Sequence, residues 1–319
     1  MSLLKRTFVL SLALIFILSA AEIASAQRPP TPRGSQKAKL VQTVGTTDIA
    51  ITYSRPAVKG RAVYGDWPTE VKGEATLDNQ NTRPKDAVLV PWGHVWRTGA
   101  DEATMFIVND DVLINGLPLA AGTYSLHSIP GKDDWTFIFN KDDGQWGSFS
   151  YDAAKDALRV KSKPTWVADS AEFLTFSSDA ITPDTATINL RWEKLSVPFT
   201  VQVKDVVGST IVRLREYAAA AKTDEFARPF NAAMWAKENK QDADAAKWFD
   251  QAEKAVDAAI AAKPTFANYR AKSNILFNAG KHHPALTATE KAIELGKAEK
   301  ADVAALEKRA ADLKAGKMN

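Results

Sequence analysis

The fold is decided by residues 104–131, which read TMFIVNDDVLINGLPLAAGTYSLHSIPG. Short runs of β-branched, aromatic and apolar residues alternate here with turn residues, which is typical of strands. The dipeptide Asn115-Gly116 lies between two apolar runs and is the strongest short-range signal for a β-hairpin. A Pro-Gly pair closes the last run. We therefore expect short antiparallel strands joined by tight turns.

The same pattern extends in both directions along the chain. Further strand-like runs occupy residues 48–53, 135–139, 173–176, 185–192 and 199–203. Many short strands with regular turn signals predict an antiparallel sandwich or barrel-like domain, which we place at residues 39–204. Residues 151–158 are expected to form a brief helical turn. The polar segment from Asp66 to Asp86 breaks the rhythm, and a loop of this length in a compact domain is usually functional or disordered.

The composition changes after Asp205, where alanine becomes dominant and the pattern turns helical. Apolar residues three and four apart predict a helix over 243–262. Two more helices are expected at 269–277 and 284–295, with Gly280 capping the first of these and Gly296 ending the second. The region 205–319 is therefore predicted to be all-α.

The last two of these helices resemble one tetratricopeptide unit. Similarly spaced small residues suggest a degenerate unit before it, with Ala245, Phe249 and Ala252 matching Ala285, Thr289 and Ala292. The alternative is a generic helical bundle. Because fewer than about three repeats are not stable alone, we expect the helical region to pack against the β domain or a protein partner.

The N-terminus is predicted to be a cleaved signal peptide, residues 1–26. Lys5 and Arg6 precede an apolar run over 7–20, and Ala24-Ser25-Ala26 has the small-x-small pattern of a cleavage site before Gln27. The apolar run is short for a membrane span, so an uncleaved anchor is the weaker alternative. We therefore expect a periplasmic or secreted protein.

The mature chain is expected to be soluble, with a Pro-rich flexible leader at residues 27–38 and no later membrane span. Loss of Lys5, Arg6 and Glu22 lowers the net charge from +3 to +2, which gives no indication of nucleic-acid binding. The chain has no cysteine, which excludes disulfides and thiolate chemistry and suits a periplasmic protein.

Three polar motifs lie beside predicted strands: SRPAVKGR at 54–61, WRTGADEAT at 96–104 and NKDDGQWG at 140–147. Guanidinium groups bind carboxylates and phosphates through paired hydrogen bonds and stack on aromatic rings. These motifs predict a site for a small anionic or carbohydrate ligand. Its candidate residues are Arg55, Lys59, Arg61, Trp96, Arg97, Asp101, Glu102 and His127. In the alternative interpretation, Arg97 pairs with Asp101 or Glu102 and only fixes the loop.

Catalysis is the second hypothesis. Asp101 or Glu102 could serve as acid or base with His127 or His94, as in a hydrolase or carbohydrate-active enzyme. No His-x-His or His-Glu-x-x-His spacing and no nucleotide-binding fingerprint occurs, so we predict no metal and no cofactor. The nine tryptophans also suggest a carbohydrate-binding face, with Trp92, Trp96, Trp135 and Trp146 near the motif loops.

The motifs resemble those of the domain of unknown function 2911 family over about residues 39–204. The resemblance also rests on GTYSL at 122–126, WTFIFNK at 135–141 and the segment 151–160. It implies an exported bacterial β-sandwich-like domain with no established activity, often followed by helices. The family usually runs from Tyr-Gly almost directly into Val-Pro-aromatic-Gly, whereas here Asp66 to Leu89 intervene.

Three functions are compatible with these patterns. We prefer a non-enzymatic ligand-binding or scaffold protein, whose helical region binds a protein partner. The hydrolase described above is the alternative. In the third hypothesis, the polar motifs of a structural envelope protein only brace turns.

Overall fold

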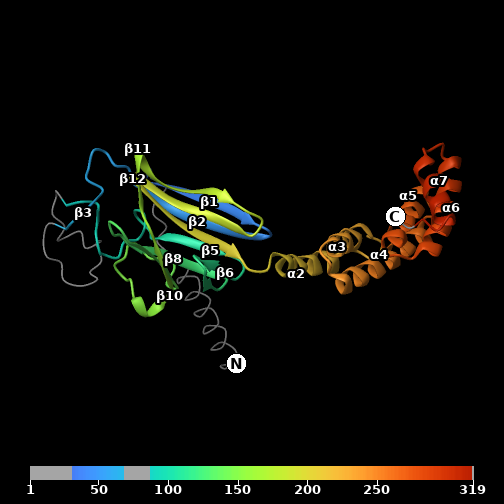
Figure 1. The fold of residues 1–319 in the computed structure, drawn as a ribbon, viewed down its shortest axis with the longest axis horizontal. Helices are drawn as coiled ribbons and strands as arrows, with labels where there is room; N and C mark the ends of the chain where they lie inside the picture. Colours follow the sequence, from blue (N-terminus) through green and yellow to red (C-terminus); the bar gives the residue numbers. More distant parts are fainter. Residues whose placement is uncertain (1–30, 68–86, 318–319) are drawn as a thin grey trace, which may run out of the picture.

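A computed structural model describes residues 31–67 and 87–317. The predicted signal peptide and most of the segment between Asp66 and Leu89 lie outside these residues. A β-rich region is followed by six helices that extend away from it (Figure 1). This arrangement confirms the predicted β domain followed by an all-α region. Within the described ranges, no helix is long and apolar enough to cross a bilayer.

The β-rich region is a sandwich of two mainly antiparallel sheets. The larger sheet has the order β1-β2-β5-β8-β9-β10, and the smaller has the order β11-β12-β6-β7. The strands of the larger sheet are β1 (Gln36–Val44), β2 (Thr47–Arg55), β5 (Thr104–Val108), β8 (Gly122–Ile129), β9 (Trp135–Asn140) and β10 (Asp156–Ser162). Those of the smaller sheet are β11 (Thr165–Ile181), β12 (Thr185–Val203), β6 (Val112–Ile114) and β7 (Leu117–Leu119). A short parallel pair, β3 (Tyr64–Gly65) and β4 (Val90–Pro91), lies outside both sheets.

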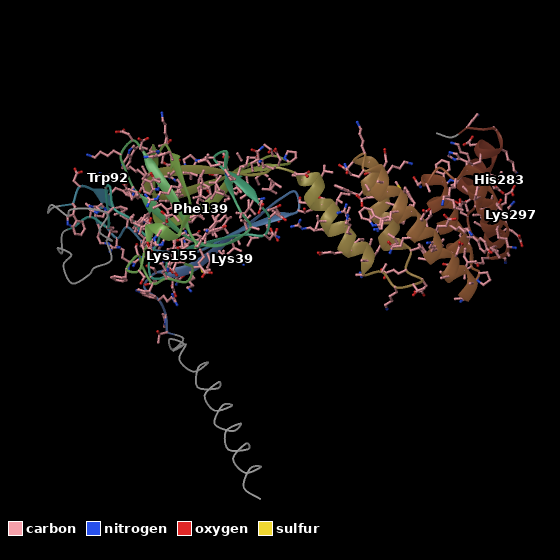
Figure 2. The ribbon with its side chains drawn as sticks, turned by 90° about the horizontal axis from the view of Figure 1, so that it is seen from below. Lys39, Trp92, Phe139, Lys155, His283 and Lys297 are labelled. Atoms are coloured by element: carbon pink, nitrogen blue, oxygen red, sulfur yellow. The ribbon has the colours of Figure 1, made fainter. Side chains whose placement is uncertain are left out.

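Aromatic side chains fill the space between the sheets. Phe106 of β5 and Phe137 and Phe139 of β9 contact Phe199 of β12, with ring centroids 6.3, 4.9 and 6.0 Å away. All four rings are almost completely buried. Burial on this scale is the main source of stability for the sandwich. Figure 2 labels Phe139 inside the β region.

Several local predictions are confirmed. The Asn115-Gly116 turn joins β6 to β7, and both residues have positive φ, of 47° and 84°, as a type I′ hairpin turn requires. A 3₁₀ turn at Ala153–Lys155 occupies the segment where a helical turn was expected. The first strand, however, begins at Gln36, inside the segment predicted as leader.

The runs predicted as two strands at 185–192 and 199–203 form one strand, β12. Buried residues alternate up to Trp192 and resume in the opposite phase at Leu195. Glu193 lies between them with φ of 52°, and the register with β11 shifts there, so the strand contains a β-bulge. Pro198 does not end the strand because the pairing with β11 stops at Ser196 and the pairing with β6 starts at Val201.

The helices form successive hairpins. They are α2 (Val206–Ala219), α3 (Ala227–Glu238), α4 (Asp242–Ala262), α5 (Phe266–Asn278), α6 (His282–Ala298) and α7 (Ala304–Lys314). The N-terminus of α2 is capped by the Asp205 carboxylate, which accepts the backbone N–H of Gly208 at 2.7 Å. Gly296 does not end the third predicted helix, because α6 continues to Ala298 and Gly296 is buried within it.

The pairs α3–α4 and α5–α6 are related by a constant shift of 40 residues along the chain. The backbone N–H of Gln241 donates to Ala236 O, and that of Lys281 donates to Leu276 O, so both first helices end in the same way. Buried positions of α4 and α6 correspond at the same shift: Ala245 and Ala285, Trp248 and Ala288, Phe249 and Thr289, Ala252 and Ala292. The helical region therefore contains an internal structural repeat.

Helix α2 connects the helical region to the sandwich. Nη2 of Arg213 donates to Oδ2 of Asp110 at 2.7 Å, and the Thr47 hydroxyl donates to the same oxygen at 2.7 Å. Burial alone would raise the pKa of Asp110, but the hydrogen bonds from Arg213 and Thr47 outweigh it and lower the pKa. The contact therefore favours the ionised carboxylate.

Candidate functional site

The 96–104 motif forms a strap pinned to the neighbouring strand β8. Trp96 and Ser128 exchange backbone hydrogen bonds at 2.8 Å in both directions. The Thr98 hydroxyl donates to Ser128 Oγ at 3.0 Å, and the Thr104 hydroxyl donates to Thr98 O at 2.8 Å. Thr98 and Asp101 both have positive φ, of 54° and 57°, so the strap bends sharply twice. These contacts give the motif a fixed shape.

Four of the eight predicted residues line one cleft of about 270 Å³: Arg61, Trp96, Arg97 and Asp101. Trp96 is almost fully buried, and its ring stacks on Trp192 with centroids 6.1 Å apart and planes 17° apart. Its indole N–H donates to Gly99 O at 3.1 Å. The cleft thus has a rigid aromatic wall beside two guanidinium-bearing residues from separate loops.

Backbone carbonyls hold the guanidinium of Arg61. Nε donates to Val58 O at 3.1 Å, and Nη2 donates to Ala57 O at 2.6 Å. Nη1 makes no hydrogen bond in the part of the chain that the structure describes. Nε of Arg97 makes a long contact to Gly99 O at 3.4 Å. Main-chain atoms therefore orient the guanidinium of Arg61.

Glu102 does not line this cleft and is bound by two cations near the N-terminus. Nη1 of Arg33 donates to both of its carboxylate oxygens at 2.9 and 2.7 Å, and Nζ of Lys37 lies 3.2 Å away. Burial acts to raise the pKa of Glu102, but the hydrogen bonds from Arg33 and Lys37 lower it to about 2. Glu102 thus fastens the N-terminal segment to the strap.

Arg55 and Lys59 are engaged elsewhere. Arg55 donates to Leu174 O at 2.8 Å and to Thr175 Oγ1 at 2.6 Å, and its guanidinium lies 5.7 Å from the Phe173 ring centroid. The backbone N–H of Lys59 donates to Glu172 Oε1 at 2.9 Å, and the residue is exposed. Arg55 therefore holds β2 against β11.

Of the four proposed acid-base groups, Asp101 lines the cleft and the other three do not. His127 is fully buried in β8, with its ring 5.1 Å from that of Tyr151. His94 is also buried, with its ring 6.3 Å from Trp67. Asp101 lines the cleft, whereas Glu102 is ion-paired as described above. Across residues 31–67 and 87–317, no group of three or more histidines and carboxylates is placed to hold a metal.

A second and larger cleft, of about 780 Å³, was not predicted as a unit. It is lined by Tyr64, Trp92 and Trp166 together with charged residues. Trp92 belongs to the predicted aromatic face, but Trp96 and Trp135 of that face are buried in the core. The sequence did not indicate Trp166 as a site residue, because no motif surrounds it at the start of β11. Figure 2 shows Trp92 at the end of the β region away from the helices.

The family model described as "Protein of unknown function (DUF2911)" matches residues 35–201, more than half of the chain. The chain belongs to the DUF2911 family. The match covers the described sandwich except the last two residues of β12 and stops before α2, so the helices lie outside the DUF2911 domain. No curated protein and no solved structure matches the chain.

Proposed function

We propose that the DUF2911 domain of this protein is a non-enzymatic binding module for a small carboxylate or phosphate. The observation that carries this proposal is the cleft shared by Arg61 and Arg97 beside the stacked indoles of Trp96 and Trp192. Guanidinium groups suit carboxylates and phosphates because their N–H groups match paired oxygen acceptors.

The charge of the cleft favours an anion. Arg61 and Arg97 contribute two positive charges, and Asp101 contributes one negative charge. The buried indoles lower the local dielectric constant, which strengthens the attraction between a guanidinium and an anion. The carbonyl contacts of Arg61 hold its side chain before the ligand arrives, which reduces the entropy lost on binding.

The helical region completes the proposal as a surface for a protein partner. The 40-residue repeat of two helical hairpins supports a repeat-type scaffold, although tetratricopeptide units are shorter, at about 34 residues. We place the mature protein in the periplasm or outside the cell, on the basis of the signal-like N-terminus.

Thermal unfolding of the mature chain, from Gln27 onward, with inorganic phosphate and with succinate tests the proposal. A ligand at 100 times its dissociation constant adds about 2.7 kcal/mol to the free energy of unfolding. We expect a rise in Tm of several degrees with at least one probe. Arg61→Ala and Arg97→Ala should abolish the rise, and added salt should reduce it.

Lys59→Ala is the matched control, because it removes an exposed cation two residues from Arg61 that does not line the cleft. Its Tm rise should equal that of the wild type. The proposal fails if neither probe shifts Tm, or if Lys59→Ala loses the shift as completely as Arg61→Ala. Turnover of a cell-envelope substrate that is lost in Arg97→Ala would instead indicate an enzyme.

A further inference from the structure

The larger cleft has an exposed aromatic wall that packing does not explain. Trp166 opens β11, where its backbone pairs with Leu195, yet its side chain is 53 % exposed. Most large aromatic residues of this domain are buried, and Trp135 and Trp192 nearby are almost fully so. An exposed indole beside a cavity is a common feature of ligand-binding surfaces.

The wall is held rigidly by neighbouring rings. Tyr64 stacks on Trp92, with centroids 5.6 Å apart and planes 10° apart. Its ring also meets Trp166 nearly at a right angle, at 6.3 Å, and Trp192 at 6.2 Å. These contacts fix the orientation of Trp92 and Trp166 before any ligand binds.

The rest of the lining carries charges of both signs. Lys132, Asp133, Asp134 and Lys163 line the cleft with Asp66, whose carboxylate lies 3.6 Å from Nζ of Lys132. These groups offer many hydrogen-bond donors and acceptors without a strong net charge. The mixture suits a neutral ligand with several hydroxyl groups better than an anion or a cation.

Tyr64 contributes its ring, and not its hydroxyl, to the surface of the cleft. Its hydroxyl is buried and has no hydrogen-bond partner in the structure of the described chain. Burial also raises the pKa of Tyr64, which therefore keeps its proton.

We propose that this cleft binds a neutral carbohydrate, with a sugar ring stacked on Trp166 or Trp92 and its hydroxyls bonded to the lysines and aspartates of the rim. The apolar face of a pyranose matches an indole ring, and its equatorial hydroxyls match alternating donors and acceptors. A volume of about 780 Å³ lies within the range of small-molecule sites, roughly 300–1,000 Å³, and accommodates more than one sugar unit.

This carbohydrate site is separate from the anion site, although the two share one aromatic cluster. Tyr64 lines the larger cleft and Trp192 lines the smaller one, and the two rings are in edge-to-face contact. Neither arginine of the smaller cleft lines the larger one. Binding at each site is therefore tested with its own variants.

The experiment uses the mature chain on an array of neutral oligosaccharides that includes cellotetraose, maltotetraose and chitotetraose, followed by calorimetric titration of each sugar that binds. We expect saturable binding of at least one sugar. Trp166→Ala should weaken it about fivefold, because an aromatic stacking contact is worth roughly 1 kcal/mol. Trp166→Phe should restore part of the affinity.

Phe173→Ala is the matched control, because Phe173 lies on the same strand with a similar exposure of 50 % but outside the cleft. It should bind sugar like the wild type, and so should Arg61→Ala. Circular dichroism of each variant separates loss of binding from loss of fold. The proposal is overturned if no sugar binds, or if Trp166→Ala leaves sugar binding unchanged. It is also overturned if the cleft binds choline in place of sugars.

Discussion

At the scale of single residues, Glu102 shows how a motif residue with catalytic chemistry is used for structure. Two cations from the N-terminal segment, Arg33 and Lys37, surround its carboxylate. A general acid at neutral pH needs a raised pKa, whereas the pKa of Glu102 is lowered to about 2. Its charge therefore holds the start of β1 and the residues just before it against the strap.

This ion pair predicts a pH-dependent loss of stability. The pKa of Glu102 is lowered from 4.5 to about 2 in the folded chain, so its contribution is complete above about pH 4.5. The contribution falls as the pH drops from about 4.5 towards 2. We expect Glu102→Gln to lower the free energy of unfolding by about 1 kcal/mol at neutral pH, as partly exposed pairs do.

Urea unfolding of the wild type and Glu102→Gln between neutral and acid pH measures this difference. The two proteins should converge in stability at low pH. Asp143→Asn, at an exposed position of a neighbouring loop, serves as the control and should change stability by less than about 0.5 kcal/mol. A difference that stays constant down to pH 2 would contradict the assignment to the ion pairs.

The residue types in the sequence predicted a binding site, but four of its eight candidate residues do not line the cleft. Arg61, Trp96, Arg97 and Asp101 do line one cleft. Arg55, by contrast, is turned to the backbone of β11, more than a hundred residues away along the chain. Such long-range partners leave no local pattern, and for the same reason Trp166 and Tyr64 could not be grouped from the sequence.

At the scale of secondary-structure elements, local signals predicted strands and helices well where their period was constant. The Asn115-Gly116 hairpin and the strand at 104–108 have the predicted bounds because turn chemistry and alternation agree there. The sequence predicted two strands where β12 is one, because the bulge at Glu193 reverses the alternation of buried and exposed residues. A reversal of phase looks the same in sequence as the end of one strand and the start of another.

Gly296 illustrates a second ambiguity in the sequence. A glycine can end a helix, or it can lie within a helix and let another segment pack closely against it. A Cβ at this position would lie 2.5 Å from Cγ1 of Val303 and 2.9 Å from Cε2 of Phe266. The glycine therefore allows the segment after α6 and the start of α5 to approach the helix closely.

Gly296→Ala is expected to destabilise the helical region by roughly 1 kcal/mol and by no more than about 2 kcal/mol. The overpacking cost, about 1–3 kcal/mol, exceeds the gain of about 1 kcal/mol from helix propensity. Urea unfolding followed by far-ultraviolet circular dichroism measures the change. Val303→Ala should make room, so the double variant should lose less than the sum of the two single changes. A Gly296→Ala protein more stable than the wild type would show that the gain in helix propensity exceeds the cost of overpacking.

At the scale of the whole molecule, the sandwich and the helical row meet at α2 (Figure 1), through a few polar groups and through Val206, which packs against the sandwich core. Arg213 of α2 bonds Asp110 in the turn after β5, and the Thr46 hydroxyl lies 3.5 Å from the hydroxyls of Ser209 and Thr210. A contact this small holds two parts less firmly than a large apolar interface. The sequence predicted that the helices pack against the sandwich or a partner, but it could not identify this contact.

Arg213→Leu should therefore loosen the attachment of α2 without unfolding either part. We expect faster amide hydrogen exchange in the first turns of α2 and in the β1–β2 turn, and a stability change of no more than about 1 kcal/mol, as for other partly exposed ion pairs. Arg215→Leu is the matched control, because Arg215 lies on the same helix but bonds Asp244 of α4 at 3.1 Å. It should speed amide hydrogen exchange where α2 contacts α4 and leave the β1–β2 turn unchanged.

Because the pKa of Asp110 is lowered, acid that protonates this carboxylate should loosen the wild type in the same places as Arg213→Leu. Equal exchange in Arg213→Leu and the wild type would mean that the hydroxyl contacts of Thr46 or apolar packing carry the attachment.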